Sequence, residues 1–231
     1  MNAKPLLKKV YGSIGHLPGS KLGSGDRTIN DGQYKLCCVK ARKSDVIIVQ
    51  EKLDGSCCGV ARVDGKLIPL GRKGYMALSS PREQHVLFHN WVMERIEKFE
   101  WLNEGERVVG EWLALAHGTK YDLTGRDPFV VFDIFDKNNK RKTVDETINY
   151  CFDNELAHVP ILHSGDAISV EEIKDILQKS RYGAEQPEGA IWRVETVNKR
   201  IHRTFNLIAK YVRNDYITSK YSEEEIWNWR P

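Results

Sequence analysis

Short apolar runs rich in β-branched residues recur along the chain, each bounded by polar or turn-forming residues. Runs of this length are typical of strands, whereas a longer 3.6-residue repeat indicates a helix. Two of the runs flank Asp64-Gly65, which is a strong signal for a tight hairpin. The predicted strands are Val46–Val49, Cys57–Val63, Leu67–Leu70, Arg107–Leu115, Phe129–Phe135, Ala190–Val194 and Leu207–Val212.

Helix starts are marked by capping boxes, in which a serine or threonine precedes a glutamate by three positions. The clearest one begins at Ser80 and has Pro81 at the first helical position. Thr143–Glu146 and Ser169–Glu172 show the same pattern. Ser222–Glu225 predicts a last short helix in the C-terminal segment.

Strands in hairpin order with helices between them favour an α+β domain, built from mostly antiparallel sheets flanked by helices. Neither a G-x-G-x-x-G nor a P-loop sequence occurs, so the common nucleotide-binding motifs do not explain the chain. With 231 residues, of which 41% are hydrophobic, the chain is long enough to bury a real core. We expect one domain over residues 1–231.

Glycine and polar residues dominate positions 11–33 without any period. This composition predicts a loop, and residues 1–45 are interpreted as a glycine-rich N-terminal arm. A flexible linker would have this composition. So would a loop that contacts phosphates through its backbone N–H groups and the cations of Lys21 and Arg27.

The overall charge neither demands nor excludes a nucleic-acid partner, because Lys+Arg number 35 against Asp+Glu 32. The five cysteines show no C-x-x-C spacing and their number is odd, which favours buried thiols in a reducing compartment. The N-terminus lacks the apolar core of a signal peptide, and the longest apolar run, Trp112–Ala116, is too short to span a membrane. We therefore expect a cytoplasmic protein.

Several predicted strands each carry one charged residue that an apolar core would exclude. Taken alone, Lys52 after the Val46–Val49 run is more often an ordinary lysine at a turn. Unpaired charges at strand positions cost stability unless they meet one another or a ligand, so the whole set indicates a site. The set consists of Lys52, Glu111, Asp133, Glu188 and Lys210.

The order and spacing of these residues resemble the covalent nucleotidyltransferases, which comprise DNA ligases, RNA ligases and mRNA-capping enzymes. The matching motifs, in family order, are Lys52-Leu53-Asp54-Gly55 (K-x-D-G), Gly71-Arg72, Val109–Trp112, Phe129–Ile134, Glu188-Gly189 and Lys210. Within this superfamily, Glu51–Ser56, Gly110–Leu113 with His117-Gly118, and Phe132-Asp133 are most similar to ATP-dependent RNA ligases. The 11–26 stretch resembles the N-terminal segment of stand-alone bacterial and phage members.

The resemblance implies the nucleotidyltransferase (ATP-grasp-like) fold. Only 21 residues follow Lys210, which leaves no room for an OB domain, so we expect a bare nucleotidyltransferase domain with residues 214–231 as a short helical tail. The chain departs from the family at Ile208, where the usual K-x-K motif has its first lysine. Lys210 is then expected to act alone or with Arg213.

The resemblance also implies the chemistry. Lys52 would attack the α-phosphorus of ATP as a neutral amine, release pyrophosphate and form a lysyl-AMP intermediate. Desolvation and nearby cations, namely Arg72, Lys210 and bound Mg²⁺ (or Mn²⁺), are expected to lower the pKa of Lys52. Lys210 would neutralise charge on the α-phosphate, while Glu188, directly or through water, and Glu111 would organise the metal.

Further nucleotide contacts follow from the same resemblance. Glu111 would accept a hydrogen bond from a ribose hydroxyl, and Phe132 and Ile191 would contact opposite faces of the adenine. Asp133 is either structural or on the ribose side. The full expected set of nucleotide-binding residues is Glu51, Lys52, Asp54, Gly55, Arg72, Glu111, Phe132, Glu188, Ile191 and Lys210.

The implied substrate is RNA with 5′-phosphate and 3′-hydroxyl ends, either nicked or single-stranded. Lys21, Arg27, Arg72 and Lys73 are candidate phosphate contacts, although each would also suit a solvated surface. A minimal DNA ligase and a non-catalytic nucleic-acid-binding module are the alternatives. We expect a monomer, and a protein partner could supply additional grip on the substrate.

Overall fold

Ten strands and four helices are seen in the computed structural model, which describes residues 4–183, 185–197, 203–221 and 223–231. The strands are β1 (Gly15–His16), β2 (Asp45–Lys52), β3 (Ser56–Val63), β4 (Lys66–Gly71), β5 (Arg107–Trp112), β6 (Phe129–Phe135), β7 (Ala157–His158), β8 (Ile161–Gly165), β9 (Gly189–Val197) and β10 (Arg203–Val212). The helices are α1 (Asp31–Cys38), α2 (Glu83–Met93), α3 (Val144–Asp153) and α4 (Val170–Ile176), with 3-10 turns at Ala77–Ser79 and Ile96–Phe99.

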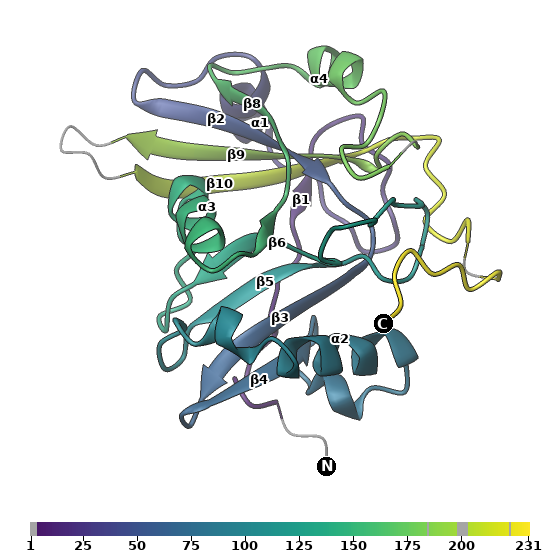
Figure 1. Cartoon of the computed structure of the whole chain (residues 1–231). Coiled ribbons are helices and arrows are strands. Elements are labelled where there is room, and N and C mark those ends of the chain that lie inside the picture. The colour runs from purple at the N-terminus through teal and green to yellow at the C-terminus, as the bar shows by residue number, and fades with distance from the viewer. Residues whose placement is uncertain (1–3, 184, 198–202, 222) are drawn as a thin grey trace.

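The strands form two five-stranded sheets (Figure 1). Sheet A has the order β1-β10-β9-β2-β8, and sheet B has the order β4-β3-β5-β6-β7. All neighbouring strands are antiparallel except for the pairs β1/β10 and β6/β7. The predicted α+β class with mostly antiparallel sheets is therefore confirmed.

The predicted strands are present, and their sequences fit their places in the sheets. β2 lies between β9 and β8, and nearly all its residues are buried, which explains its continuous apolar run. β3 and β4 are joined by Asp64 and Gly65, whose φ angles are 51° and 72°. Positive φ at both central residues is the hairpin geometry that an Asp-Gly pair favours.

Helices cover the outer faces of both sheets. Phe88 and Trp91 of α2 pack with Trp112 and Phe129 of sheet B, while buried residues of α1 and α4 pack on sheet A. Figure 1 shows α2 below sheet B and both α1 and α4 above sheet A. This arrangement leaves the region between the sheets for polar groups.

Two of the predicted capping boxes are confirmed, and one is wrong. Thr143 and Ser169 cap α3 and α4, and each makes the reciprocal bonds with the glutamate three residues later. The first turn of α2 instead begins after Arg82. The Ser80 hydroxyl accepts a bond from the backbone N–H of Arg82 at 3.2 Å, which makes a turn before the helix rather than a cap.

Other elements were missed or misplaced. Helix α1 lies inside the expected glycine-rich arm, and Asn30 and Gln33 form its capping box. The strands β1, β7 and β8 were not predicted either. Ser222 lies outside the described residues, and the described residues 223–231 contain no helix. There Trp229 packs edge-on against Trp112, with 5.6 Å between the ring centroids.

Two simple properties complete the description. All five cysteines are free thiols, and four of them are buried. Among the described residues, no helix has both the length and the apolar character needed to cross a membrane.

Candidate active site

The K-x-D-G segment is the place where the chain crosses from one sheet to the other. Lys52 is the last residue of β2 in sheet A, and Ser56 is the first residue of β3 in sheet B. Only glycine fits in the crossing, because a Cβ on Gly55 would lie 2.4 Å from the backbone oxygen of Trp112. The Gly55 N–H donates to Glu111 Oε1 at 3.0 Å. The crossing therefore fixes Lys52 between the sheets and brings Glu111 close to it.

Asp54 holds the crossing segment in place. Its backbone N–H donates to the Tyr121 hydroxyl at 2.7 Å, and its Oδ2 accepts from the Gly118 N–H at 2.8 Å and from the Tyr216 hydroxyl. These partners come from the loop after β5 and from the segment after β10. Asp54 thus connects three distant parts of the chain beneath Lys52.

Lys52 forms an ion pair with Glu188, because strand pairing places Lys52 opposite Gly189. Burial lowers the pKa of Lys52. The carboxylates of Glu188, Asp54 and Glu111 raise it by more than burial lowers it, so the pKa lies above its ordinary value. The expected lowered pKa is therefore wrong for the protein without nucleotide or metal. The reason is that the charges of three carboxylates near the amine outweigh burial and the neighbouring Lys210 charge.

The two carboxylates near Lys52 are hard to ionise. Burial raises the pKa of Glu188, and the ion pair with Lys52 opposes this only in part. The pKa of Glu111 is raised to about 8. Burial is the main cause, the Asp54 charge adds to the rise, and the Lys52 charge opposes it. Two such groups share one ammonium, and this concentration of acidic groups is typical of a site that receives a cation.

Lys210 faces the site from β10, where it pairs with Ile191 of β9. Burial and the Lys52 charge lower its pKa, while Asp26, 3.7 Å from its Nζ, opposes the shift. Asp26 also lies 3.0 Å from His16 Nε2, and His16 Nδ1 lies 2.7 Å from the Ser20 hydroxyl. The glycine-rich arm therefore positions Lys210, and sequence reasoning missed His16 and Asp26 because nothing in the pattern pairs them with β10.

A cavity of about 710 Å³ opens between the sheets at this point. Its volume is in the range of sites that bind small molecules. The residues predicted to bind the nucleotide all line it: Glu51, Lys52, Asp54, Gly55, Arg72, Glu111, Phe132, Glu188, Ile191 and Lys210. The structure thus brings together residues that span most of the chain.

The predicted phosphate contacts divide into two groups. Arg72 and Lys73 line the cavity, and Arg72 Nη2 also donates to the Gly12 carbonyl at 3.2 Å. Lys21 and Arg27 do not line it. The Lys21 ammonium instead donates to the Tyr216 carbonyl, so it ties the arm to the C-terminal segment.

Glu51 is anchored away from the lysine. Its carboxylate accepts hydrogen bonds from the Ser180 hydroxyl and from the Arg181 N–H, the latter at 3.0 Å. Burial raises its pKa, and these bonds oppose the rise. The backbone N–H of Glu51 donates to the Pro160 carbonyl at 2.9 Å, so the group that Glu51 can offer a ligand is its backbone carbonyl.

Asp133 does not line the cavity and has a structural role. It is fully buried, and its carboxylate lies 2.7 Å from Arg193 Nη1, 2.8 Å from Arg141 Nε and 2.6 Å from the Tyr11 hydroxyl. Burial raises the pKa of Asp133, but the two guanidinium groups lower it more, so it stays below its ordinary value. This cluster joins β6 of sheet B to β9 of sheet A and to the arm. Of the two roles left open for Asp133, the structure supports this one.

Ile208, at the position of the missing family lysine, pairs with Arg193 on β9. Arg193 lines the cavity and is buried. The position opposite Ile208 on the neighbouring strand therefore carries a positive charge.

One rim of the cavity contains residues that sequence reasoning missed. Arg82 and His85 come from the start of α2, and His117 comes from the loop after β5. Burial lowers the pKa of both histidines, and the Arg82 charge lowers it further. Two sequence signals were present. One is the His117-Gly118 pair; the other is His85, which lies four residues before His89 and is interpreted from the sequence as a surface or packing histidine.

The donor set near Lys52 suits a hydrated metal ion. Among the described residues, no group of three or more His, Cys, Asp or Glu side chains could enclose a metal. Four carboxylates of the described residues line the cavity. Those of Glu51 and Asp54 each accept two hydrogen bonds from other parts of the protein, so Glu188 and Glu111 are the candidate metal ligands. Mg²⁺ commonly binds through one or two carboxylates together with substrate phosphates, and the residues present fit that mode.

Solved structures with a similar fold are forms of Naegleria gruberi RNA ligase. The structure with pyrophosphate has a TM-score of 0.58 and 20% identity, and covers 89% of this chain and 60% of that chain. A mutant with ATP and Mn has a TM-score of 0.54 and 20% identity, and covers 74% and 51%. A mutant without ligand has a TM-score of 0.53 and 23% identity, and covers 74% and 50%. At these identities the likeness concerns the fold, and the chain spans between half and 60% of the Naegleria protein.

Sequence comparison gives a separate result. No curated protein matches the chain. The RNA ligase family model matches residues 45–212, which include every strand from β2 to β10 and the K-x-D-G crossing. Since this match extends over most of its length, the chain belongs to the RNA ligase family.

Proposed function

We propose that this protein is an ATP-dependent RNA ligase that joins 5′-phosphate and 3′-hydroxyl ends through a lysyl-AMP intermediate on Lys52. The observation that carries the proposal is the position of Lys52. It lies on the wall of a nucleotide-sized cavity with Glu188, Glu111 and Lys210 also on that wall. A lysine in this setting is both desolvated and partnered, as a reactive lysine must be.

The first step is attack by the Lys52 amine on the α-phosphorus of ATP. A P–N bond forms, the bond from the α-phosphorus to the bridging oxygen breaks, and pyrophosphate leaves. Lys210 and Arg72 are cations on the same wall, and they stabilise charge that grows on the phosphate oxygens. Burial and the Lys52 charge lower the pKa of Lys210, while Asp26 and Glu188 oppose the shift.

The amine must lose a proton before it attacks. In the protein without nucleotide it is an ammonium paired with Glu188. The raised pKa of Glu188 makes this carboxylate a better proton acceptor than an ordinary glutamate. We therefore assign Glu188 two duties: it holds the ammonium in the resting state, and it accepts the proton or helps to hold the metal when the nucleotide binds.

Mg²⁺ or Mn²⁺ would be held by Glu188 and Glu111, directly or through water. A bound divalent ion would supply positive charge beside Lys52, which lowers the pKa of the amine and neutralises phosphate charge. The same charge would favour the ionised form of Glu111, whose pKa burial raises to about 8 despite the nearby Lys52 charge.

The remaining contacts fix the nucleotide. Phe132 and Ile191 are half-buried residues on the cavity wall and would contact the adenine faces. The ribose hydroxyl would bond to Glu111. The Glu51 side chain is bonded elsewhere and its N–H donates to the Pro160 carbonyl at 2.9 Å, so its backbone carbonyl would make the contact with the adenine edge.

Two further steps use the same wall. AMP passes from Lys52 to the 5′-phosphate of an RNA end, and the 3′-hydroxyl of a second end displaces AMP to form the phosphodiester. Lys73, Arg82 and His85 lie at the rim and would contact the incoming strands. We propose a monomer, with a partner protein as a possible source of further grip on RNA.

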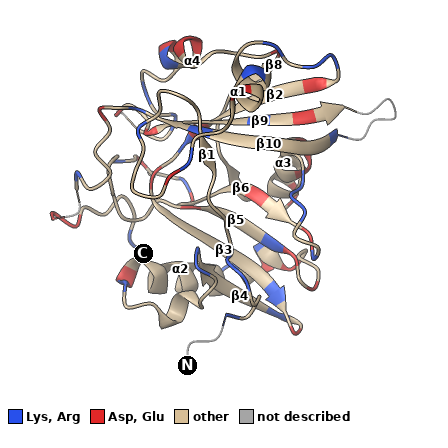
Figure 2. Ribbon diagram, turned by 180° about the vertical axis from the view of Figure 1, so that it is seen from behind, with Lys and Arg blue, Asp and Glu red and all other residues tan. Residues whose placement is uncertain are grey.

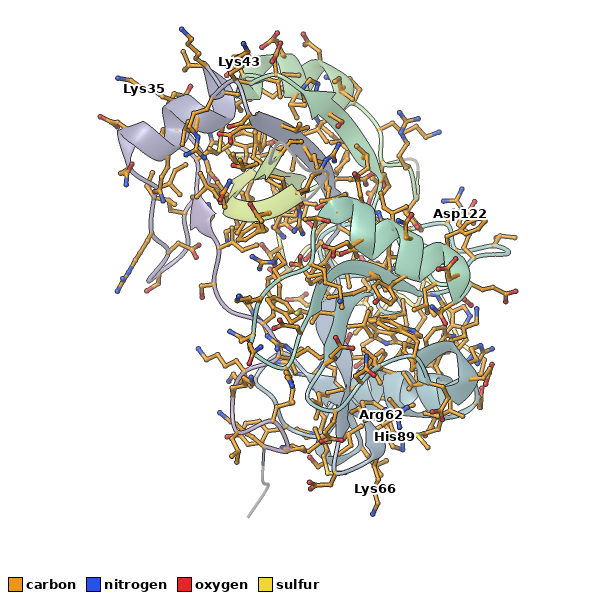
Figure 3. All side chains as sticks on the ribbon, turned by 90° about the vertical axis from the view of Figure 1, so that its left-hand side faces the viewer. Lys35, Lys43, Arg62, Lys66, His89 and Asp122 are labelled. Atoms are coloured by element: carbon orange, nitrogen blue, oxygen red, sulfur yellow. The ribbon has the colours of Figure 1, made fainter. Side chains whose placement is uncertain are left out.

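Covalent labelling tests the first step. The protein is incubated with α-labelled ATP and Mg²⁺ and then separated by denaturing electrophoresis. We expect label on the wild type and on Lys66→Ala, an exposed lysine of the β3–β4 hairpin (Figure 3), and none on Lys52→Ala or after metal chelation. Label that persists in Lys52→Ala would reject the mechanism, and label from GTP in place of ATP would indicate capping chemistry.

A second assay tests the substrate. Nicked duplexes made wholly of RNA or wholly of DNA are compared at equal concentrations. Sealing of the RNA nick, or of single-stranded RNA ends, supports the proposal. Sealing of the DNA nick alone would identify a minimal DNA ligase.

A further inference from the structure

A second cavity, of about 820 Å³, lies at the opposite ends of the strands from Lys52. It is lined by Arg107 at the start of β5, Phe135 at the end of β6, and Arg203 and Phe205 at the start of β10. Lys210 lies five positions after Phe205 along β10, a span of about 17 Å in a strand. The two cavities share no lining residue.

This second cavity is strongly basic. Its lining carries the cations of Lys8, Lys9, Arg107, Lys140, Arg141 and Arg203. Among the described residues, Glu146 is the one acidic residue in the lining, and its carboxylate accepts bonds from the N–H and hydroxyl of Thr143, both at 2.8 Å. Figure 2 shows basic residues at the start of β10, on the side of the molecule toward α3.

Only part of this positive charge is neutralised within the protein. Arg203 lies 2.8 Å from Asp145, and Arg141 lies 2.8 Å from Asp133. Lys8, Lys9 and Lys140 form no ion pair within the described parts of the chain. An anionic ligand would supply the missing counter-charge.

Arg107 is the buried anchor of the cavity. Its side chain is 2% exposed, its Nε donates to the Val10 carbonyl at 2.8 Å, and its Nη2 donates to Asn139 Oδ1 at 2.6 Å. Its Nη1 has no hydrogen-bond partner in the described residues. Burial and the neighbouring Arg141 charge together lower the pKa of Arg107 to about 10. A buried guanidinium with a spare donor is rare unless a ligand completes it.

Aromatic rings lie among these cations. The Arg107 guanidinium is 4.0 Å from the centre of the Phe135 ring, and the Arg141 guanidinium is 4.5 Å from that of Phe205. Phe135 is buried, whereas Phe205 is half-buried at the edge of the cavity. Cations interleaved with aromatic faces are the features by which proteins bind single-stranded nucleic acid, through phosphate contacts and base stacking.

We propose that the second cavity binds a single-stranded stretch of the RNA substrate away from the reacting ends. Arg107 and the three lysines contact its phosphates, and Phe205 stacks on a base. The inference rests on the proposed RNA ligase function and adds a site of substrate grip to it. Arg141 also donates to the Tyr11 hydroxyl at 3.1 Å, and Tyr11 lines the nucleotide cavity, so one wall separates the two sites.

The test uses exposed or half-buried lysines so that folding is preserved. One protein carries Lys8→Ser, Lys9→Ser and Lys140→Ser. The matched control carries Lys35→Ser, Lys43→Ser and Lys66→Ser, which remove the same charge from exposed positions elsewhere (Figure 3). A third protein carries Phe205→Ala. Binding of a fluorescent single-stranded RNA with hydroxyls at both ends is measured across a range of salt concentrations.

We expect the cavity triple variant to bind this RNA at least about tenfold more weakly, with a salt slope smaller by about 2, as three lost phosphate contacts require. The control should change less than about threefold, and Phe205→Ala should lose affinity with little change of slope. Equal binding by the two triple variants would overturn the inference. Inorganic pyrophosphate is also added as a competitor for RNA binding. If it displaces RNA from the wild type but not from the cavity variant, and the cavity variant binds RNA as well as the wild type does, the cavity holds a small anion and the inference is overturned.

Covalent labelling with α-labelled ATP is measured on the same proteins. Normal labelling with weakened RNA binding supports both proposals. Normal labelling with unchanged RNA binding rejects only the second cavity. If the wild type is not labelled, the proposed function fails, and the RNA-binding result is still read separately.

Discussion

Two clusters of charged residues lie between the sheets, and they differ in how they are satisfied. In the Asp133 cluster, Asp133 is 0% exposed and Arg193 is 2% exposed, and the carboxylate is bonded by Arg193, Arg141 and Tyr11. In the Lys52 cluster, the lysine side chain is 22% exposed and Glu188 is 9% exposed. There the carboxylates of Glu188 and Glu111 face a single ammonium on a cavity wall.

This difference indicates that the Asp133 cluster stabilises the fold and that the Lys52 cluster binds a ligand. Arg193 holds the pKa of Asp133 low, so that charge is stabilised by the protein itself. The pKa values of Glu188 and Glu111 are raised, so their charge is not stabilised without a further cation. A buried pair that is complete mainly joins the sheets, whereas an incomplete set beside a cavity is a candidate for ligand binding.

The largest effect is expected when the complete cluster is broken. Asp133→Asn leaves Arg193 buried without its main counter-charge, and breaking a buried pair in this way costs about 3–5 kcal/mol. Urea unfolding followed by circular dichroism measures the loss. A change below about 1 kcal/mol would mean that the cluster does not join the sheets as described.

The next effect concerns the incomplete cluster and appears in activity instead of stability. Glu188→Ala removes the partner of the Lys52 ammonium, and we expect AMP transfer to Lys52 to slow by about 10²–10³-fold. The Lys52 side chain is 22% exposed, so water can hydrate its ammonium when Glu188 is removed, and the free energy of unfolding should fall by less than in Asp133→Asn. Single-turnover labelling and urea unfolding on the same protein check both parts. A large stability loss with normal labelling would reverse the assignment of the two clusters.

The sequence predicted the strands better than the arm and the tail. The β3–β4 hairpin was clear because Asp64-Gly65 adopts the positive φ angles that this pair favours. The capping boxes at Thr143 and Ser169 were also local signals. Helix α1 was missed because the predicted loop, residues 11–33, includes Asn30, the residue that caps this helix. The tail was wrong because Trp229 packs on Trp112, a distant contact that a local helix pattern does not reveal.

The candidate site was predictable as a list but not as a geometry. The charged residues on separate strands were evident, and the family resemblance ordered them. The sequence did not reveal that Asp133 pairs with Arg193 and leaves the cavity, because both lie in strands that look equally suited to a site. It also gave the wrong direction for the pKa of Lys52 in the protein without nucleotide or metal. The carboxylates that raise this pKa include those of Glu111 and Glu188, which are distant in the sequence and meet Lys52 only in the folded protein.

Tyr11 touches both regions, and its substitution measures how far they are coupled. Tyr11→Phe removes the hydroxyl that donates to Asp133 at 2.6 Å but keeps the ring on the nucleotide cavity wall. Loss of a hydrogen bond to a charged group is expected to cost about 1.5–3 kcal/mol of unfolding free energy. Labelling of Lys52 at saturating ATP should change less than about threefold. A larger loss of labelling would show that the Asp133 cluster controls the active site as well as the fold.

The smallest effect comes from the pH dependence of stability. The pKa of Glu111 is about 8 in the folded protein, above its ordinary value of 4.5, so the folded state retains a proton that the unfolded state has lost. Its contribution to stability is therefore lost as pH rises from about 4.5 to about 8, by roughly 1 kcal/mol between pH 7 and pH 8. Glu111→Gln cannot titrate, so the variant should gain stability relative to the wild type over that interval. Urea unfolding of both proteins at pH 6, 7 and 8 measures the difference, and parallel curves would show that the Glu111 carboxylate is already ionised by the surrounding charges.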